Sequence, residues 1–65
     1  MKNLFIELTD TNDSKIFLNA MHIAWIEPGK NGTVIRSNMV NHSLNIKVQE
    51  SYDKVKELIR SLDNS

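Results

Sequence analysis

The sequence contains no cysteine, one proline and two glycines among its 65 residues. Without cysteine, the chain has neither a disulfide framework nor a zinc site built on thiolates. Both glycines, Gly29 and Gly32, fall in one predicted turn, which excludes a glycine-rich phosphate-binding loop. Of the devices that commonly stabilise a chain this short, oligomerisation is the one that remains.

The chain also lacks an excess of charge of either sign. Eight Lys and Arg residues balance eight Asp and Glu residues, so the protein has no net field that would attract nucleic acid or an anionic lipid surface. Four cations on predicted strands and turns form no clear stripe, and no aromatic residues alternate with them as in a base-stacking platform. These cations are Lys15, Lys30, Arg36 and Lys47. A small nucleic-acid-binding regulatory or phage-borne protein is therefore the alternative interpretation, and nucleic acid is a disfavoured partner.

Long hydrophobic runs are absent as well. The apolar run at the start of the chain is interrupted by Glu7, whereas a signal peptide needs roughly 7–15 apolar residues. No stretch approaches the roughly 18–20 apolar residues of a spanning helix. We expect a cytoplasmic protein without a membrane span.

Alternation of apolar and polar residues predicts strands at about 3–9 and 15–19. Five turn-forming residues at 10–14 separate them, so the two strands read as a hairpin. Leu4, Ile6 and Leu8 are predicted to face the core. Phe5 and Phe17 fall on the opposite face, which is then more apolar than a solvated face requires.

Three more strands are predicted at about 22–27, 33–37 and 43–48. The spacing of three between Ile23 and Ile26 does not fit a flat strand, and a bulge or a short helical turn would reconcile it. Asn31-Gly32 between apolar runs is a strong hairpin signal. Residues 38–41 read as a connector before the last strand.

From Ser51 the period changes to that of a helix, predicted at about 51–62. Its apolar positions form one stripe, and Ser51 is placed to cap it. Short connections favour an antiparallel arrangement. We therefore predict a single domain, 1–65, of the α+β class: an antiparallel β-meander of about five short strands followed by one C-terminal amphipathic helix.

One short helix can cover only one face of such a sheet, and the apolar residues exceed what it can bury. We expect a second copy of the chain to cover the rest, most simply in a homodimer, joined by sheet edges or by sheet faces. The interface candidates are Phe5, Phe17, Trp25 and Met39. Trp25 suits either a core or an interface.

No constellation of residues predicts catalysis, a metal site or a cofactor. His22 and His42 would need carboxylates beside them to bind a metal, and no spacing places any there. Glu7 and Glu27 lie near strand ends, where a pair of carboxylates could act as acid and base, but nothing in their spacing requires such a site and we interpret them as surface charges. Ser43 and its neighbour His42 would point to opposite faces of a strand. We expect a protein that is not an enzyme.

The chain resembles the FlbD/SwrD family of small flagellar-motility proteins over residues 6–59. The resemblance lies in Ile6-Glu7-Leu8-Thr9, Leu18-Asn19, Ile23, Ile26-Glu27, Thr33-Val34-Ile35, Asn38, Val48-x-Glu50-Ser51, Val55 and Ile59. The chain departs from the family in its first turn, where Asn12-Asp13 replaces the usual Asn-Gly, and it lacks the basic extension that often follows the helix.

This resemblance implies a cytoplasmic accessory role in motility, exercised through contact with another protein whose identity the sequence does not give. It supplies no catalytic residue. The polar positions shared with the family are predicted to make strand-end and cap hydrogen bonds. These positions are Asn19, Glu27, Glu50 and Ser51.

Overall fold

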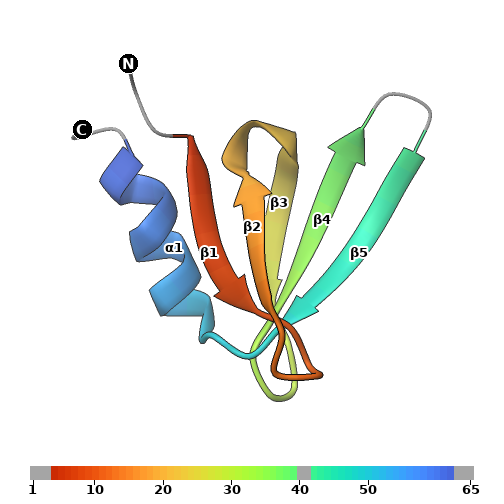
Figure 1. Ribbon diagram of the computed structural model, residues 1–65, viewed down its shortest axis with the longest axis vertical. Helices are drawn as coiled ribbons and strands as arrows, with labels where there is room; N and C mark the ends of the chain where they lie inside the picture. The colour runs from red at the N-terminus through yellow and green to blue at the C-terminus, as the bar shows by residue number, and fades with distance from the viewer. Residues whose placement is uncertain (1–3, 40–41, 63–65) are drawn as a thin grey trace.

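The computed structural model describes residues 4–39 and 42–62, without the side chains of Met39, His42 and Ser43. Five short antiparallel strands form two sheets, and one helix follows them (Figure 1). The predicted α+β class is confirmed. The elements are β1 (Phe5–Thr9), β2 (Lys15–Asn19), the 3-10 turn η1 (Ala20–His22), β3 (Ile23–Pro28), β4 (Thr33–Met39), β5 (His42–Val48) and α1 (Tyr52–Ser61).

The first sheet is the hairpin β1–β2. Its ladder pairs Ile6 with Leu18 and Leu8 with Ile16, so these four residues share the inner face. The turn between the strands is fixed by Asp10, whose Oδ1 accepts the backbone N–H groups of Asn12 and Ser14, both at 2.9 Å. Turn-forming residues therefore act here as the sequence indicated.

The second sheet has the order β3–β4–β5. The register shifts between Ile23 and Trp25, directly after η1. A short helical turn and a bulge thus both occur, and together they account for the spacing of the two isoleucines. Ile26 and Ile23 consequently pair with the buried residues Ile35 and Ser37.

Strand β4 extends to Met39, two residues beyond the predicted end at 37. The predicted connector at 38–41 therefore begins later, because the ladder continues through Asn38–Ser43 and Met39–His42. Cross-strand pairing determined this boundary, whereas the local sequence with its polar asparagines suggested a loop. Residues 40 and 41 of that connector lie outside the described residues.

The two sheets meet at one end and diverge at the other (Figure 1). Asp10 forms an isolated antiparallel bridge with Val48, and the Gln49 N–H donates to the Thr9 carbonyl oxygen at 2.8 Å. Helix α1 flanks β1 and contacts β3. Its stripe places Val55 in the core. In the part of the chain that the structure describes, the buried hydrophobic residues are Ile6, Leu8, Ile35, Val48 and Val55.

Candidate protein-interaction surface

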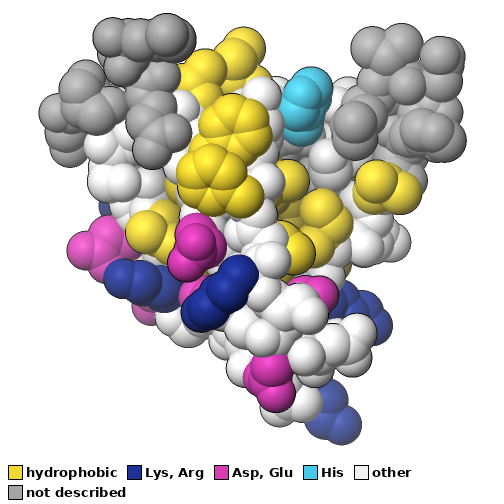
Figure 2. Space-filling view, viewed as in Figure 1, with side chains coloured by type: hydrophobic (Ala, Val, Ile, Leu, Met, Phe, Trp, Pro, Cys, Tyr) yellow, Lys and Arg dark blue, Asp and Glu magenta, His cyan; other side chains and the backbone are white. Residues whose placement is uncertain are grey.

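The outer face of the β1–β2 sheet carries two stacked aromatic rings. Period-two alternation puts Phe5 and Phe17 on the side opposite to Ile6 and Leu8. Their ring centroids are 5.0 Å apart and their planes differ by 16°. Phe5 is 40% exposed and Phe17 is 64% exposed. In Figure 2, apolar side chains gather over β1 and β2, and others show in the hollow between these strands and β4–β5. We call Phe5 and Phe17 the aromatic pair.

Polar residues complete this face. Glu7 lies directly opposite Phe17 on the ladder, Asn19 lies opposite Phe5, and Lys15 lies opposite Thr9. Asn19 also caps η1, because its Oδ1 accepts the Met21 N–H at 3.0 Å. Met21, in the turn that leaves this end of the sheet, is 73% exposed. The face therefore has an apolar centre, with the negatively charged Glu7 and the positively charged Lys15 beside it.

The Glu50 carboxylate holds this sheet in place against the rest of the molecule. It accepts the Thr9 backbone N–H and the Thr9 hydroxyl, each at 2.9 Å, while the Glu50 carbonyl oxygen accepts the Thr33 hydroxyl of β4 at 2.7 Å. Lys15 Nζ donates to Thr9 Oγ1 at 3.0 Å. One residue thus connects both sheets at the entrance to the helix.

These contacts set the ionisation of Glu50. Burial alone would raise its pKa, but hydrogen bonds from the Thr9 and Glu50 backbone N–H groups and from the Thr9 hydroxyl, with the nearby Lys15 charge, lower the pKa below its usual value. The carboxylate is therefore ionised at neutral pH and binds β1 in its charged form.

Trp25 lies on the other sheet. It pairs with Arg36 on the outer face of β3–β4 and is 57% exposed. The Arg36 guanidinium is held by Glu27, with Nε and Nη2 at 3.0 and 2.8 Å from Oε1. A surface cavity of about 340 Å³ lies beside Trp25 and Arg36. Its lining is Ala24, Trp25, Arg36, Ser37, Asn38, Leu44 and Asn45.

The four predicted interface residues are thus not one cluster. The structure brings Phe5 and Phe17 together and places Trp25 on the outer face of the second sheet. Met39 ends β4, and its side chain lies outside the described residues. Sequence reasoning missed Met21, which sits in a turn where no periodicity marks it. It also missed Leu44, which alternation on β5 puts on the same face as the buried Val48 but which is 47% exposed.

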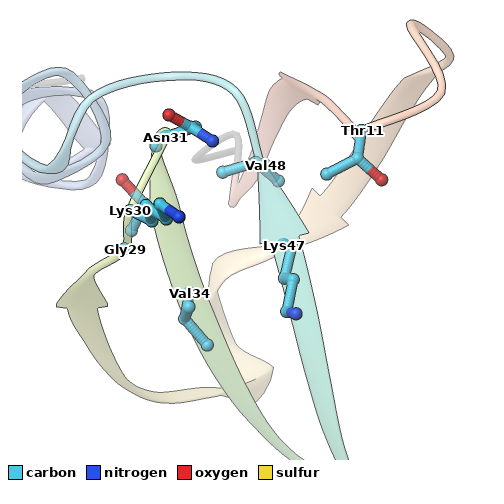
Figure 3. Close-up of a pocket in the computed structure, with 9 residues that line it drawn as sticks. Thr11, Gly29, Lys30, Asn31, Val34, Lys47 and Val48 are labelled. Carbon is cyan, nitrogen blue, oxygen red and sulfur yellow. The ribbon is translucent and has the colours of Figure 1, made fainter.

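A second hollow, of about 360 Å³, lies on the β3–β4 hairpin (Figure 3). Lys30 of the turn and Lys47 of β5 both line it, together with Thr11, Asn31 and Val34. The remaining predicted cations lie elsewhere: Lys15 is on the β1–β2 sheet, and Arg36 is paired with Glu27. These four cations are therefore divided between two sheets and a turn.

The residues considered for chemistry are also separated. Glu7 lies on the β1–β2 sheet, and Glu27 lies on the β3–β4–β5 sheet in its pair with Arg36. His22 ends η1, while the side chains of His42 and Ser43 lie outside the described residues. Within residues 4–39 and 42–62, no group of three or more acidic or histidine side chains is arranged to hold a metal ion.

Among the described residues, no helix has the length and apolar character needed to cross a lipid bilayer. The comparisons with known proteins give no relative: no protein-family model, curated protein or solved structure matches this chain.

Proposed function

We propose that this protein is a small non-catalytic interaction module that self-associates as a homodimer through the aromatic pair. The observation that carries this proposal is the exposure of two stacked phenylalanine rings, 40% and 64% exposed, on the outer face of the β1–β2 sheet. Removing this apolar ring surface from water by contact with a partner lowers the free energy of the system. Large aromatic side chains are also the residues that commonly anchor protein interfaces.

The size of the core supports the same proposal. Among the described residues, five hydrophobic residues are buried and five large hydrophobic residues are exposed, and the chain has no cysteine to cross-link it. A domain of this size buries a smaller fraction of its surface than a larger one does. Association with a second copy would enlarge the buried apolar area at the face where the monomer exposes its stacked rings.

Substitution of the aromatic pair tests self-association. We expect Phe17→Ala to remain folded, because Phe17 is 64% exposed and lies outside the core, and to be monomeric at concentrations where the unmodified protein forms dimers. Sedimentation velocity over a range of concentrations measures the mass. The matched control is Trp25→Ala, which removes an aromatic ring of similar exposure from the other sheet and should leave the dimer intact. Equal self-association in all three proteins would contradict the proposal.

We further propose that the module is an accessory of flagellar motility, on the strength of its resemblance to the FlbD/SwrD family. In this proposal Trp25, on the sheet that the dimer leaves accessible, contacts the other protein. Tagged protein recovered from the source organism should retain flagellar stator or basal-body proteins, and the Trp25→Ala variant should lose them. Recovery of the chain alone from motile cells would contradict the motility role and leave self-association unaffected.

A further inference from the structure

The outer face of the β1–β2 sheet has a pattern that complements itself. Three cross-strand pairs share the face: Phe5–Asn19, Glu7–Phe17 and Thr9–Lys15. Each phenylalanine is thus opposite a polar residue, and the two rings lie on a diagonal across the strands. Beside each ring is a ladder position that carries no ring of its own.

A two-fold axis parallel to the strands fits this pattern. Under that operation, β1 of one copy lies over β2 of the other, and each ladder pair lies over the same ladder pair of the other copy with its two residues exchanged. Phe17 of one copy then faces the Glu7 position of the other, and Phe5 faces the Asn19 position. The four rings interlock without lying directly on top of one another. Sheets packed face to face in this way are about 10 Å apart.

The same operation brings opposite charges together. Lys15 of one copy lies over Thr9 of the other, two residues along β1 from Glu7, or about 7 Å. Both side chains are long enough to meet across that step. Within one described chain, Glu7 and Lys15 form no ion pair with each other, and Lys15 Nζ donates to Thr9 Oγ1 with one of its three N–H groups. Glu7 is therefore available to a second copy, and Lys15, whose charge also acts on Glu50, keeps two of its N–H groups for one.

We propose that a second copy of this chain covers the aromatic pair in a two-fold symmetric, face-to-face dimer, with Glu7 of each copy paired to Lys15 of the other. The proposal rests on the proposed function, and it specifies which residues determine that the partner is the chain itself. In such an isologous contact one complementary pair of residues is used twice. The zero net charge of the chain adds no repulsion between copies.

The area of the face sets the expected strength. The exposed parts of the two rings amount to roughly 200 Å² per copy, given the usual area of an aromatic side chain. A standard interface has about 800 Å² per partner, so even with the surrounding polar residues this contact belongs to the weak class. We expect a dissociation constant for the dimer between roughly 1 µM and 1 mM.

Charge reversal tests the pairing. We expect Glu7→Lys and Lys15→Glu, each alone, to dimerise at least about tenfold more weakly than the unmodified protein, because like charges then face each other twice. An equimolar mixture of the two variants should regain the dimer, now as a heterodimer, which native mass spectrometry distinguishes from either homodimer. The reciprocal charge positions make this recovery the expected signature of the two-fold contact.

The outcomes separate the two proposals. If the unmodified protein dimerises and both variants dimerise equally well, the two-fold pairing is overturned while self-association stands. If the unmodified protein is monomeric at roughly 1 mM, the proposed function itself fails. Because Lys15 also bonds Thr9, folding of Lys15→Glu is checked by circular dichroism. If that variant does not fold, Glu7→Lys must weaken the dimer more than Glu7→Gln does, and equal effects would overturn the pairing.

Discussion

At the scale of single residues, Glu50 connects segments that lie far apart in the sequence. Its side chain binds Thr9, 41 positions away, and its carbonyl oxygen accepts a hydrogen bond from Thr33. The helix cap follows directly, since Ser51 Oγ accepts the Lys54 N–H at 3.2 Å. The Glu50 carboxylate therefore helps to fix the sheet that presents the aromatic pair, together with the Asp10–Val48 bridge and the bond from Gln49 N–H to the Thr9 carbonyl oxygen.

Glu50→Gln should lower the free energy of unfolding at pH 7 by about 1 kcal/mol, because the amide keeps one acceptor oxygen but loses the charge that strengthens both bonds to Thr9. The lowered pKa of Glu50 means that the ionised form is favoured in the folded state. Its stabilisation is present above the unfolded pKa, 4.5, and is lost as pH falls through the lower folded pKa. The difference between the two proteins should therefore vanish in acid.

Urea titrations of both proteins between about pH 3 and pH 7 measure this difference. Glu57→Gln is the matched control, because Glu57 is exposed on α1, and it should leave the unfolding free energy nearly unchanged. A Glu50→Gln protein as stable as the unmodified one at pH 7 would show that the carboxylate does not hold β1.

Residue-scale predictions from the sequence succeeded where a side chain acts locally. Asn19 caps η1, Ser51 caps α1 and Glu27 binds Arg36, as strand-end and cap hydrogen bonds were expected to do. The aromatic pair was assigned to one face by its period. The stacking of the two rings was not predictable, because it depends on the register of the hairpin. The register pairs Glu7 with Phe17 and so makes Phe5 and Phe17 diagonal neighbours.

At the scale of elements, the β3–β4 hairpin depends on one glycine. Gly32 has φ +155° and lies so close to β5 that an added Cβ would overlap the Val48 carbonyl oxygen. Its carbonyl oxygen also accepts the Gly29 N–H at 2.8 Å, which closes the turn. The close approach of this turn to β5 therefore explains why position 32 is a glycine.

Gly32→Ala should destabilise the protein by about 1–3 kcal/mol, since the turn must shift away from Val48 or adopt a strained backbone. Thermal unfolding followed by circular dichroism measures the loss. Gly29→Ala in the same turn is the control, because its Cβ would meet its nearest neighbours at 3.4 Å and needs only a small adjustment. Similar melting temperatures for the two variants would contradict the close approach of the turn to β5.

Elements with strong local signals were predictable, and those set by distant partners were not. Helix α1 begins after Ser51 because the cap and the apolar stripe agree, and β1–β2 follows from alternation around a turn-rich segment. The end of β4 at Met39 depends on its pairing with β5, and the bridge between Asp10 and Val48 joins segments 38 positions apart. No local pattern encodes either contact.

At the scale of the whole molecule, the fold presents different surfaces on its two sheets. The β1–β2 sheet shows the aromatic pair, and the β3–β4–β5 sheet shows Trp25 beside Arg36. The sequence placed Phe5 and Phe17 on one face of their hairpin, but it could not place Trp25 on a separate sheet, because the division into two sheets depends on how the strands diverge from their shared end (Figure 1). A dimer formed through one face would leave the other available.

In the proposed dimer, two copies of the chain meet through their β1–β2 faces. The most direct measurement is a dilution series of ¹H–¹⁵N correlation spectra of the unmodified protein, from roughly 1 mM to the lowest usable concentration, which reports self-association residue by residue. We predict concentration-dependent shifts at Phe5, Glu7, Lys15 and Phe17, with the Trp25 indole signal unchanged. Spectra that do not change with concentration, or shifts confined to β3–β5, would contradict the account.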